Sequence, residues 1–226
     1  MEFQSALVGR FQPDYSQLKP GIKAHQEALV DLSLFIINIS KAEFCFIKIA
    51  FNPRLLSSPT LRGWNRYTVN LLAELSSLGI ELFLYYDSPL HESYLKKLLK
   101  DSYQVRISTP MRYILWEQYW LLKQSEKYQI DILHCPMNFA LPWSSPCPRV
   151  LTLHDAIDQI YYSQNIPWYQ QLNFAHIQNK LYHWIARHRA DHIITVSQYS
   201  KQDITKYLHI SEDKIKVIYE AADTMK

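Results

Sequence analysis

Hydrophobic and polar positions alternate between two kinds of segment along most of this chain. Short apolar runs rich in β-branched and aromatic residues predict strands at residues 46–51, 80–86, 103–107, 130–134, 150–153, 191–196 and 214–219. Between them, apolar residues at helical spacing predict helices at residues 65–77, 90–99, 112–128, 167–187 and 198–208, with a loop at 156–166. Strands that alternate with helices predict an α/β fold: a Rossmann-like, doubly wound parallel sheet with helices on both faces.

The first 44 residues do not follow this pattern. They are rich in turn-forming residues, including Pro13, Pro20 and Gly21, and one helix is predicted at about residues 23–39. We therefore expect an irregular or helical N-terminal extension at residues 1–44. The α/β domain is predicted to occupy residues 45–220.

Composition restricts the class of protein. With 226 residues, of which 48% are hydrophobic, the chain can bury the core of one full α/β domain. The formal net charge of +3 is small, and no basic stripe or recognition motif is present, so no nucleic-acid partner is expected. Three cysteines without a C-x-x-C motif favour a reducing compartment, and hence a cytoplasmic location. No apolar stretch is long enough to span a membrane.

The strongest candidate for chemistry is the pair His154 and Asp155, which follows the predicted strand at residues 150–153. In open α/β sheets, ligands bind outside the carboxyl ends of the strands. A histidine exchanges protons near neutral pH, and a neighbouring carboxylate can fix its tautomer or stabilise its charge. The alternative is a structural histidine followed by an aspartate that caps the next turn. The residues alone leave these two interpretations equally open.

Two further positions lie at predicted helix starts. Gly63 precedes the helix at residues 65–77, where a glycine permits close backbone approach and the helix N-terminus favours anions. A single glycine is a weak signal, because the G-x-G-x-x-G pattern is absent. Ser197 precedes the helix at residues 198–208 and is predicted to be its N-cap. A ligand contact from Ser197 would be an addition to that capping role.

Metal and membrane sites receive little support. The histidines at positions 188 and 192 are expected to diverge, and those at 176 and 183 are too far apart for one ion, so no metal site is expected. The helix around Arg112, Trp116, Trp120 and Lys123 offers aromatic and basic side chains for peripheral contact with a membrane surface. Packing of this helix against the domain is the favoured interpretation.

Several stretches together resemble one known family. FIKIAFNPRLL, GWNRYTVNLL, RYILWEQ, DILHCP, VLTLHD and ADHIITVSQYSKQDI, followed by ISEDKIKVIYEAAD, are similar in this order to the amino-terminal domain of glycosyltransferase family 4 enzymes. These are retaining transferases of the GT-B architecture, in which two Rossmann-like domains face each other across a cleft. The resemblance runs from about residue 46 to residue 223.

The resemblance implies roles for particular residues. Gly63 would approach the donor phosphates and the acceptor, His154 would contact the transferred sugar beside Asp155, and Arg66 and Ser197 would line the cleft. Relatives usually carry glycine where this chain has Asn65, whose side chain occupies room that a glycine leaves open. The family needs no metal or other cofactor; a nucleotide-sugar is the co-substrate, and a hydroxyl group of an unknown acceptor receives the sugar.

The resemblance also bears on domain organisation. Residues 221–226 resemble the start of the family's interdomain linker, so the donor-binding second domain is expected to be absent from this sequence. Activity is then expected to need a carboxyl-terminal donor-binding GT-B domain, which a separate polypeptide could supply in trans. The alternative is a non-catalytic fragment or binding subunit of a split or truncated glycosyltransferase. An unrelated nucleotide-binding Rossmann domain is disfavoured by the missing glycine fingerprint. For each of these alternatives we expect a cytoplasmic location, either free in the cytoplasm or at the inner face of a membrane.

Overall fold

The structure is a computed structural model that describes residues 31–32, 35–36, 39, 47–57, 63–77, 80–87, 103–165 and 174–219. In chain order, its elements are β1 (Lys48–Phe51), η3 (Arg54–Ser57), α3 (Gly63–Ser77), β2 (Glu81–Tyr86), β3 (Tyr103–Ile107), α5 (Tyr113–Leu115), η4 (Trp116–Trp120), α6 (Leu121–Lys127), β4 (Ile132–Cys135), β5 (Arg149–Thr152), α7 (Ile157–Asn165), α8 (Phe174–Arg189), β6 (His192–Thr195), α9 (Gln198–Leu208), η6 (Glu212–Lys214) and β7 (Ile215–Val217). The helix predicted at residues 90–99 lies outside the described residues.

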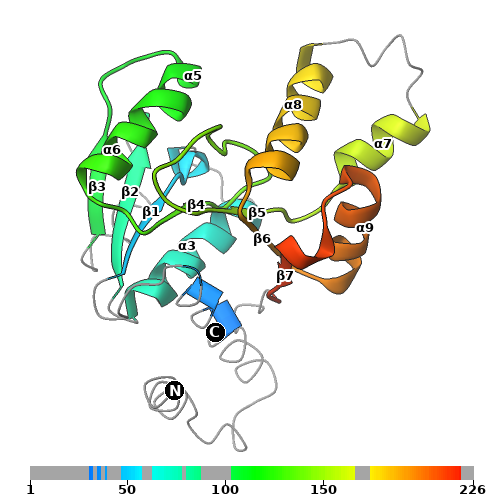
Figure 1. Ribbon diagram of the computed structural model, residues 1–226, viewed down its shortest axis with the longest axis horizontal. Coiled ribbons are helices and arrows are strands. Elements are labelled where there is room, and N and C mark those ends of the chain that lie inside the picture. The colour runs from blue at the N-terminus through cyan, green and yellow to red at the C-terminus, as the bar shows by residue number, and fades with distance from the viewer. Residues whose placement is uncertain are drawn as a thin grey trace, which may run out of the picture.

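The described strands form one seven-stranded sheet in the order β3-β2-β1-β4-β5-β6-β7, and every neighbouring pair is parallel (Figure 1). This confirms the predicted Rossmann-like α/β fold. The chain order reverses between β1 and β4, so the connections that leave these two strands run in opposite directions. That reversal opens the crevice in which such sheets bind ligands, at the carboxyl ends of the strands.

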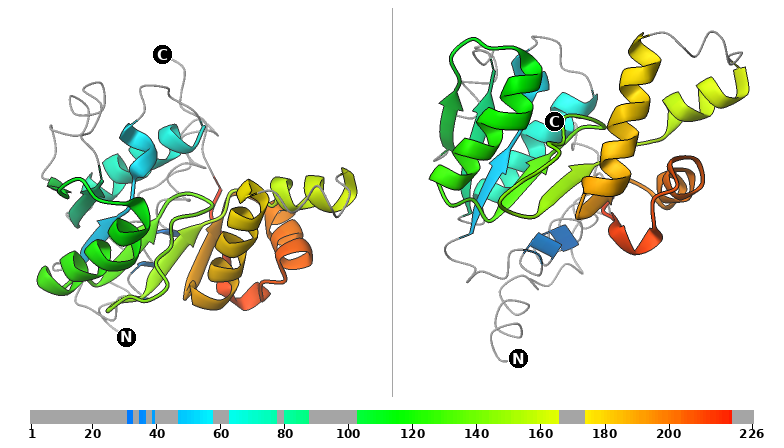
Figure 2. Two further views of the ribbon diagram at one scale, coloured as in Figure 1. Left: turned by 90° about the horizontal axis from the view of Figure 1, so that it is seen from above. Right: turned by 45° about the horizontal axis from the view of Figure 1, so that its top comes forward.

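Helices cover both faces of the sheet. Figure 2 shows α3 on one face and α6 and α8 on the other. Side chains of β1 alternate accordingly: Ile49 and Phe51 join the cluster of α3, whereas Ala50 joins the cluster of Trp116 and Leu121 on the opposite face. Because both faces are buried, the inner strands are nearly continuous apolar runs, which is why they could be predicted from the sequence, whereas the edge strand β3 is only partly buried.

Part of the N-terminal extension packs on the sheet. Leu32, Ile36 and Ile39 are helical, buried and members of the same apolar cluster as β1 and α3. Phe35 meets the edge of His192 with ring centroids 5.5 Å apart. The described positions between residues 31 and 39 therefore contribute side chains to the core of the α/β domain.

Two predicted elements differ in detail. The predicted loop at residues 156–166 contains helix α7, which begins where the Asp155 carboxylate accepts a hydrogen bond from the Ile157 N–H at 3.1 Å. The predicted helix at residues 112–128 is interrupted by η4, a π-helical turn in which the Leu121 N–H donates to the Trp116 carbonyl five residues back.

Two tryptophans of this interrupted helix pack against the domain, whereas Tyr119 on the same helix is exposed. Trp116 is fully buried, and Trp120 is partly buried against the same cluster, which confirms the packing interpretation of these residues. Within the described part of the chain, we find no helix with the length and apolar character that crossing a bilayer requires.

Candidate functional site

The carboxyl ends of four neighbouring strands carry the candidate residues. Asn52 follows β1, Pro136 follows β4, the pair at 154–155 follows β5 closely, and Ser197 lies two residues beyond β6. Because all strands are parallel, these residues lie along one edge of the sheet. The edge includes the reversal between β1 and β4.

His154 is enclosed by aromatic side chains from the first turns of α3. Its ring stacks on Trp64 with centroids 5.8 Å apart and planes 23° apart, and it meets Tyr67 edge-on at 4.9 Å. The imidazole Nε2 lies 3.5 Å from the Pro136 carbonyl oxygen, a contact that requires the proton on Nε2. His154 keeps only 7% of its surface exposed. The structure thus brings His154 together with the first turns of the helix that begins at Gly63.

Asp155 has a structural partner of its own. Its carboxylate accepts the Ile157 N–H at the start of α7, and its carbonyl oxygen lies 3.4 Å from the Asn138 amide nitrogen. The capping interpretation of Asp155 is therefore confirmed. A catalytic role for Asp155 stays a prediction.

Of the three predicted residues at the start of α3, Gly63 and Arg66 are exposed and Asn65 is buried. Gly63 is exposed, and a Cβ placed on it would have no heavy atom of the described residues within 4 Å, so none of these residues fills the space beside its backbone. Asn65 has only 4% of its surface exposed, and its backbone is not in the left-handed region. The effect of the Asn65 side chain on phosphate approach stays a prediction. Arg66 is exposed on the same helix.

Ser197 is the N-cap of α9, as predicted. Its hydroxyl oxygen accepts the Ser200 N–H at 3.0 Å, and its own proton is donated to the Ser200 hydroxyl at 2.9 Å. One lone pair of the hydroxyl oxygen has no role in the cap. Contact between Ser197 and a ligand stays a prediction.

A second histidine lies beneath His154, and sequence reasoning missed it. His134, on β4, is 2% exposed, and its Nε2 is 2.9 Å from the Thr152 hydroxyl. The Tyr67 hydroxyl lies 3.3 Å from the same Thr152 oxygen. Burial, reinforced by the nearby His154, lowers the pKa of His134 to about 3, so this histidine is neutral at physiological pH. The sequence signal that could have indicated His134 is the presence of a histidine within the apolar run DILHC.

A buried carboxyl group near the same edge was also missed. Glu117 lies in the π-helical turn and is 1% exposed; one oxygen accepts the Gln118 amide at 2.6 Å, and the other has no hydrogen-bond partner among the described residues. Burial raises the pKa of Glu117, while Tyr113, Gln118 and Arg54 oppose that effect. The Arg54 guanidinium lies 3.7 Å over the Tyr113 ring. The stretch WEQ within an apolar helix was the only hint of this residue.

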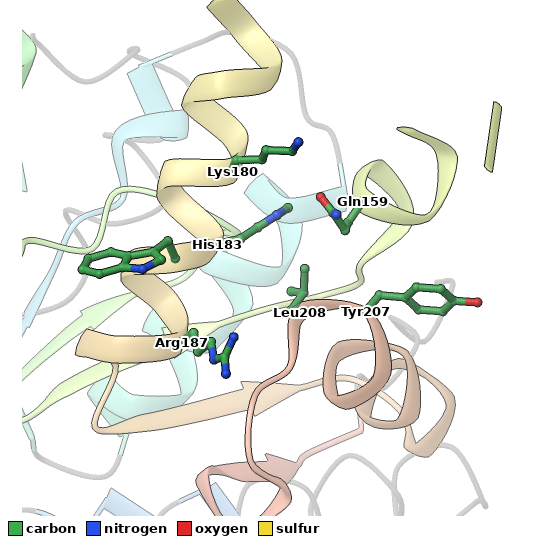
Figure 3. A pocket seen from close by; sticks show the side chains of 7 residues that line it. Gln159, Lys180, His183, Arg187, Tyr207 and Leu208 are labelled. Atoms are coloured by element: carbon green, nitrogen blue, oxygen red, sulfur yellow. The ribbon is translucent and has the colours of Figure 1, made fainter. Parts of the chain in front are cut away.

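A shallow cavity lies apart from these residues, between α7, α8 and α9 (Figure 3). Its volume is about 190 Å³, and its lining consists of Gln159, Lys180, His183, Trp184, Arg187, Tyr207 and Leu208. Burial lowers the pKa of His183, and Asp158 opposes that shift. None of the residues predicted to form the site lines this cavity.

Among the described residues, no three His, Cys, Asp or Glu side chains are grouped so that they could hold a metal ion.

Comparison with known proteins decides the family. A family model described as Glycosyltransferase Family 4 matches residues 61–226, which is most of the chain. The chain belongs to glycosyltransferase family 4. The matched region contains every predicted site residue, from Gly63 to Ser197. No curated protein matches the chain.

Two solved structures are similar to this family 4 chain. A glycosyltransferase from Rickettsia africae ESF-5 is 16% identical over 77% of this chain and 43% of its own, with a TM-score of 0.46. A mutant O-GlcNAc transferase from Thermobaculum terrenum is 11% identical over 93% of this chain and 53% of its own, with a TM-score of 0.36. The chain therefore spans about half the length of each of these proteins.

Proposed function

We propose that this family 4 chain supplies the acceptor-side domain of an enzyme that transfers a sugar from a nucleotide-sugar to a hydroxyl group with retention of anomeric configuration. The observation that carries the proposal is the contact of His154 with Trp64 and Tyr67 at the start of α3, at the carboxyl edge of a parallel sheet. This edge is where open α/β sheets bind ligands, and the helix start offers unpaired amides to anions.

Each predicted residue has a part in the proposed reaction. His154 hydrogen-bonds the transferred sugar, where a fixed donor stabilises charge that develops in the transition state. Asp155 holds the end of the strand through its cap on α7. The open space beside Gly63 admits donor phosphates or acceptor, and Arg66 and Ser197 line the cleft. Because Trp64 covers the imidazole, sugar contact requires that Trp64 moves aside.

The donor half of the site belongs, in this proposal, to a second GT-B domain, in the same or in a separate polypeptide. The family resemblance supports this arrangement, since the carboxyl-terminal domain of such enzymes grips the nucleotide-sugar. No metal or other cofactor is required in the proposal, because side chains and helix termini hold the pyrophosphate. We place the protein in the cytoplasm, with peripheral contact to a membrane surface as a variant.

The experiment compares the native protein, purified from its source cells, with the 226-residue chain alone. Intact mass establishes the length of the native protein, and both samples are assayed against a panel of nucleotide-sugars. We expect transfer only where a donor-binding domain is present, and a product whose anomeric configuration, read by NMR, equals that of the donor. An inverted product would refute the retaining mechanism. Absence of any transfer by the native protein would favour a non-catalytic binding subunit.

A further inference from the structure

The side chain of Asn138 joins two segments of the candidate site. Its Oδ1 accepts the backbone N–H of His154 at 2.8 Å, and its Nδ2 lies 3.4 Å from the carbonyl oxygen of Asp155. One amide group therefore holds the backbone on both sides of the peptide bond between these two residues. Asn138 comes from the loop at residues 136–148, which connects β4 to β5.

This bridge begins where the sheet ends. The N–H of Leu153 still donates to the Ile194 carbonyl of the neighbouring strand at 2.9 Å. Asn138 takes the next backbone N–H, that of His154, and so continues the hydrogen bonding one residue beyond the ladder. An amide side chain offers an acceptor and a donor on adjacent atoms, whereas a carboxylate accepts only and an ammonium donates only.

The loop that carries Asn138 is itself fixed. The carbonyl oxygen of Ala140 accepts the Asn52 amide at 3.0 Å and the Cys135 thiol at 3.2 Å. Phe139 contacts Trp64 from α3 and Tyr182 from α8, with ring centroids 6.2 and 5.7 Å apart. Asn138 thus lies between anchored neighbours, and its amide is pre-organised for the bridge.

We propose that Asn138 is a positioning residue, which sets the backbone of His154 and Asp155 so that the imidazole meets the sugar in the proposed reaction. The inference rests on the proposed function. The position of the imidazole depends on the position of the His154 Cα, and the Asn138 amide fixes the backbone on either side of that atom. Small displacements of a reacting or stabilising group slow catalysis strongly, because the group no longer meets the developing charge.

The test uses Asn138→Ala, which removes both contacts, and Asn138→Asp, which keeps an acceptor for the His154 N–H but removes the donor to Asp155. The matched control is Gln118→Ala: Gln118 is a second side-chain amide that holds the same loop, by accepting the Trp143 N–H at 2.8 Å. Two quantities are measured: hydrogen exchange of the His154 amide in the full chain, and kcat and KM of the native-length enzyme.

In Asn138→Ala we expect amide exchange at His154 to accelerate roughly tenfold. We also expect kcat to fall about 10- to 100-fold while KM changes by less than about threefold. Asn138→Asp should keep the amide protected and show an intermediate kcat. Gln118→Ala should leave both quantities within about threefold of the wild type.

Unchanged exchange in Asn138→Ala would overturn the inference, as would an equal loss of kcat in Gln118→Ala. The hydrogen-exchange measurement distinguishes failure of this inference from failure of the proposed function. If the wild-type enzyme transfers no sugar while the exchange pattern holds, the proposed reaction is wrong, and Asn138 is a structural clamp without a part in transfer.

Discussion

Replacing Thr152 by valine removes one hydroxyl group on which two neighbours depend. The Thr152 oxygen lies 2.9 Å from Nε2 of buried His134 and 3.3 Å from the Tyr67 hydroxyl. Valine has nearly the same shape, so packing is conserved while both contacts are lost. Leaving a buried polar group without a partner costs about 1–3 kcal/mol. The Tyr67 contact is long and only part-buried, and it adds about 0.5 kcal/mol at the low end of the range for a hydrogen bond.

We therefore expect Thr152→Val to lower the free energy of unfolding by about 1.5–3.5 kcal/mol. For a chain of this length, that corresponds to a fall in Tm of about 3–14 °C. Urea unfolding followed by tryptophan fluorescence, together with a thermal melt followed by circular dichroism, measures both quantities.

The matched control is Thr195→Val on the neighbouring strand. Thr195 is also fully buried, but its hydroxyl has no hydrogen-bond partner among the described residues. Removing an unpartnered buried hydroxyl should be neutral or stabilising, within about 0.5 kcal/mol of neutral. Equal losses in the two variants, or no loss in Thr152→Val, would refute the hydrogen-bonded layer beneath His154.

Three further predictions concern stability. The pKa of His134 is about 3 in the folded chain and about 6.5 when the chain is unfolded. Neutral His134 therefore contributes to the free energy of unfolding above pH 6.5, and this contribution is lost as pH falls towards 3, by about 1.4 kcal/mol per pH unit. Unfolding at several pH values checks this, and the slope should flatten in His134→Gln. Burial raises the pKa of Glu117, because the charged carboxylate is disfavoured in the buried site. Glu117→Gln, which carries no charge, should therefore stabilise the chain at pH 7 but not at pH 4. Equal effects at the two pH values would show that Glu117 is not a buried charge. Ile36→Ala should cost about 2–4 kcal/mol, whereas Ile177→Ala, at a position that is 53% exposed, should cost less than about 1 kcal/mol; equal costs would show that the extension does not pack in the core.

The sequence was sufficient for the sheet because its strands are buried on both faces. The run IELFLYY needs no tertiary information to be recognised as a strand, and the parallel order follows from its alternation with helices. Helix α7 was missed because Ile157, Ile160 and Tyr161 are too few to establish a helical face. Its start depends on the cap by Asp155, which is local but common to turns and helices.

The candidate site could be predicted only in part. The rule that ligands bind at carboxyl ends of strands pointed to His154, the predicted helix start pointed to Gly63, and the family resemblance added Arg66. The supporting layer could not be found in this way, because its contacts join residues far apart in the chain. Tyr67 and Thr152 are separated by 85 positions, and Asn138 and His154 by 16. Nothing in the local sequence of an asparagine or a threonine marks such a partner.

The most direct test of the account is the turnover of the native-length enzyme after His154→Ala, measured with the nucleotide-sugar that it uses. His188→Ala, at an exposed position on α8, is the control for loss of an imidazole elsewhere. Tm of each variant is measured alongside. We expect kcat to fall by about 100-fold or more in His154→Ala, because a fixed group that stabilises the transition state is lost, with little change in His188→Ala. A folded His154→Ala enzyme that turns over at the wild-type rate would contradict the central claim that sugar transfer takes place at this edge of the sheet.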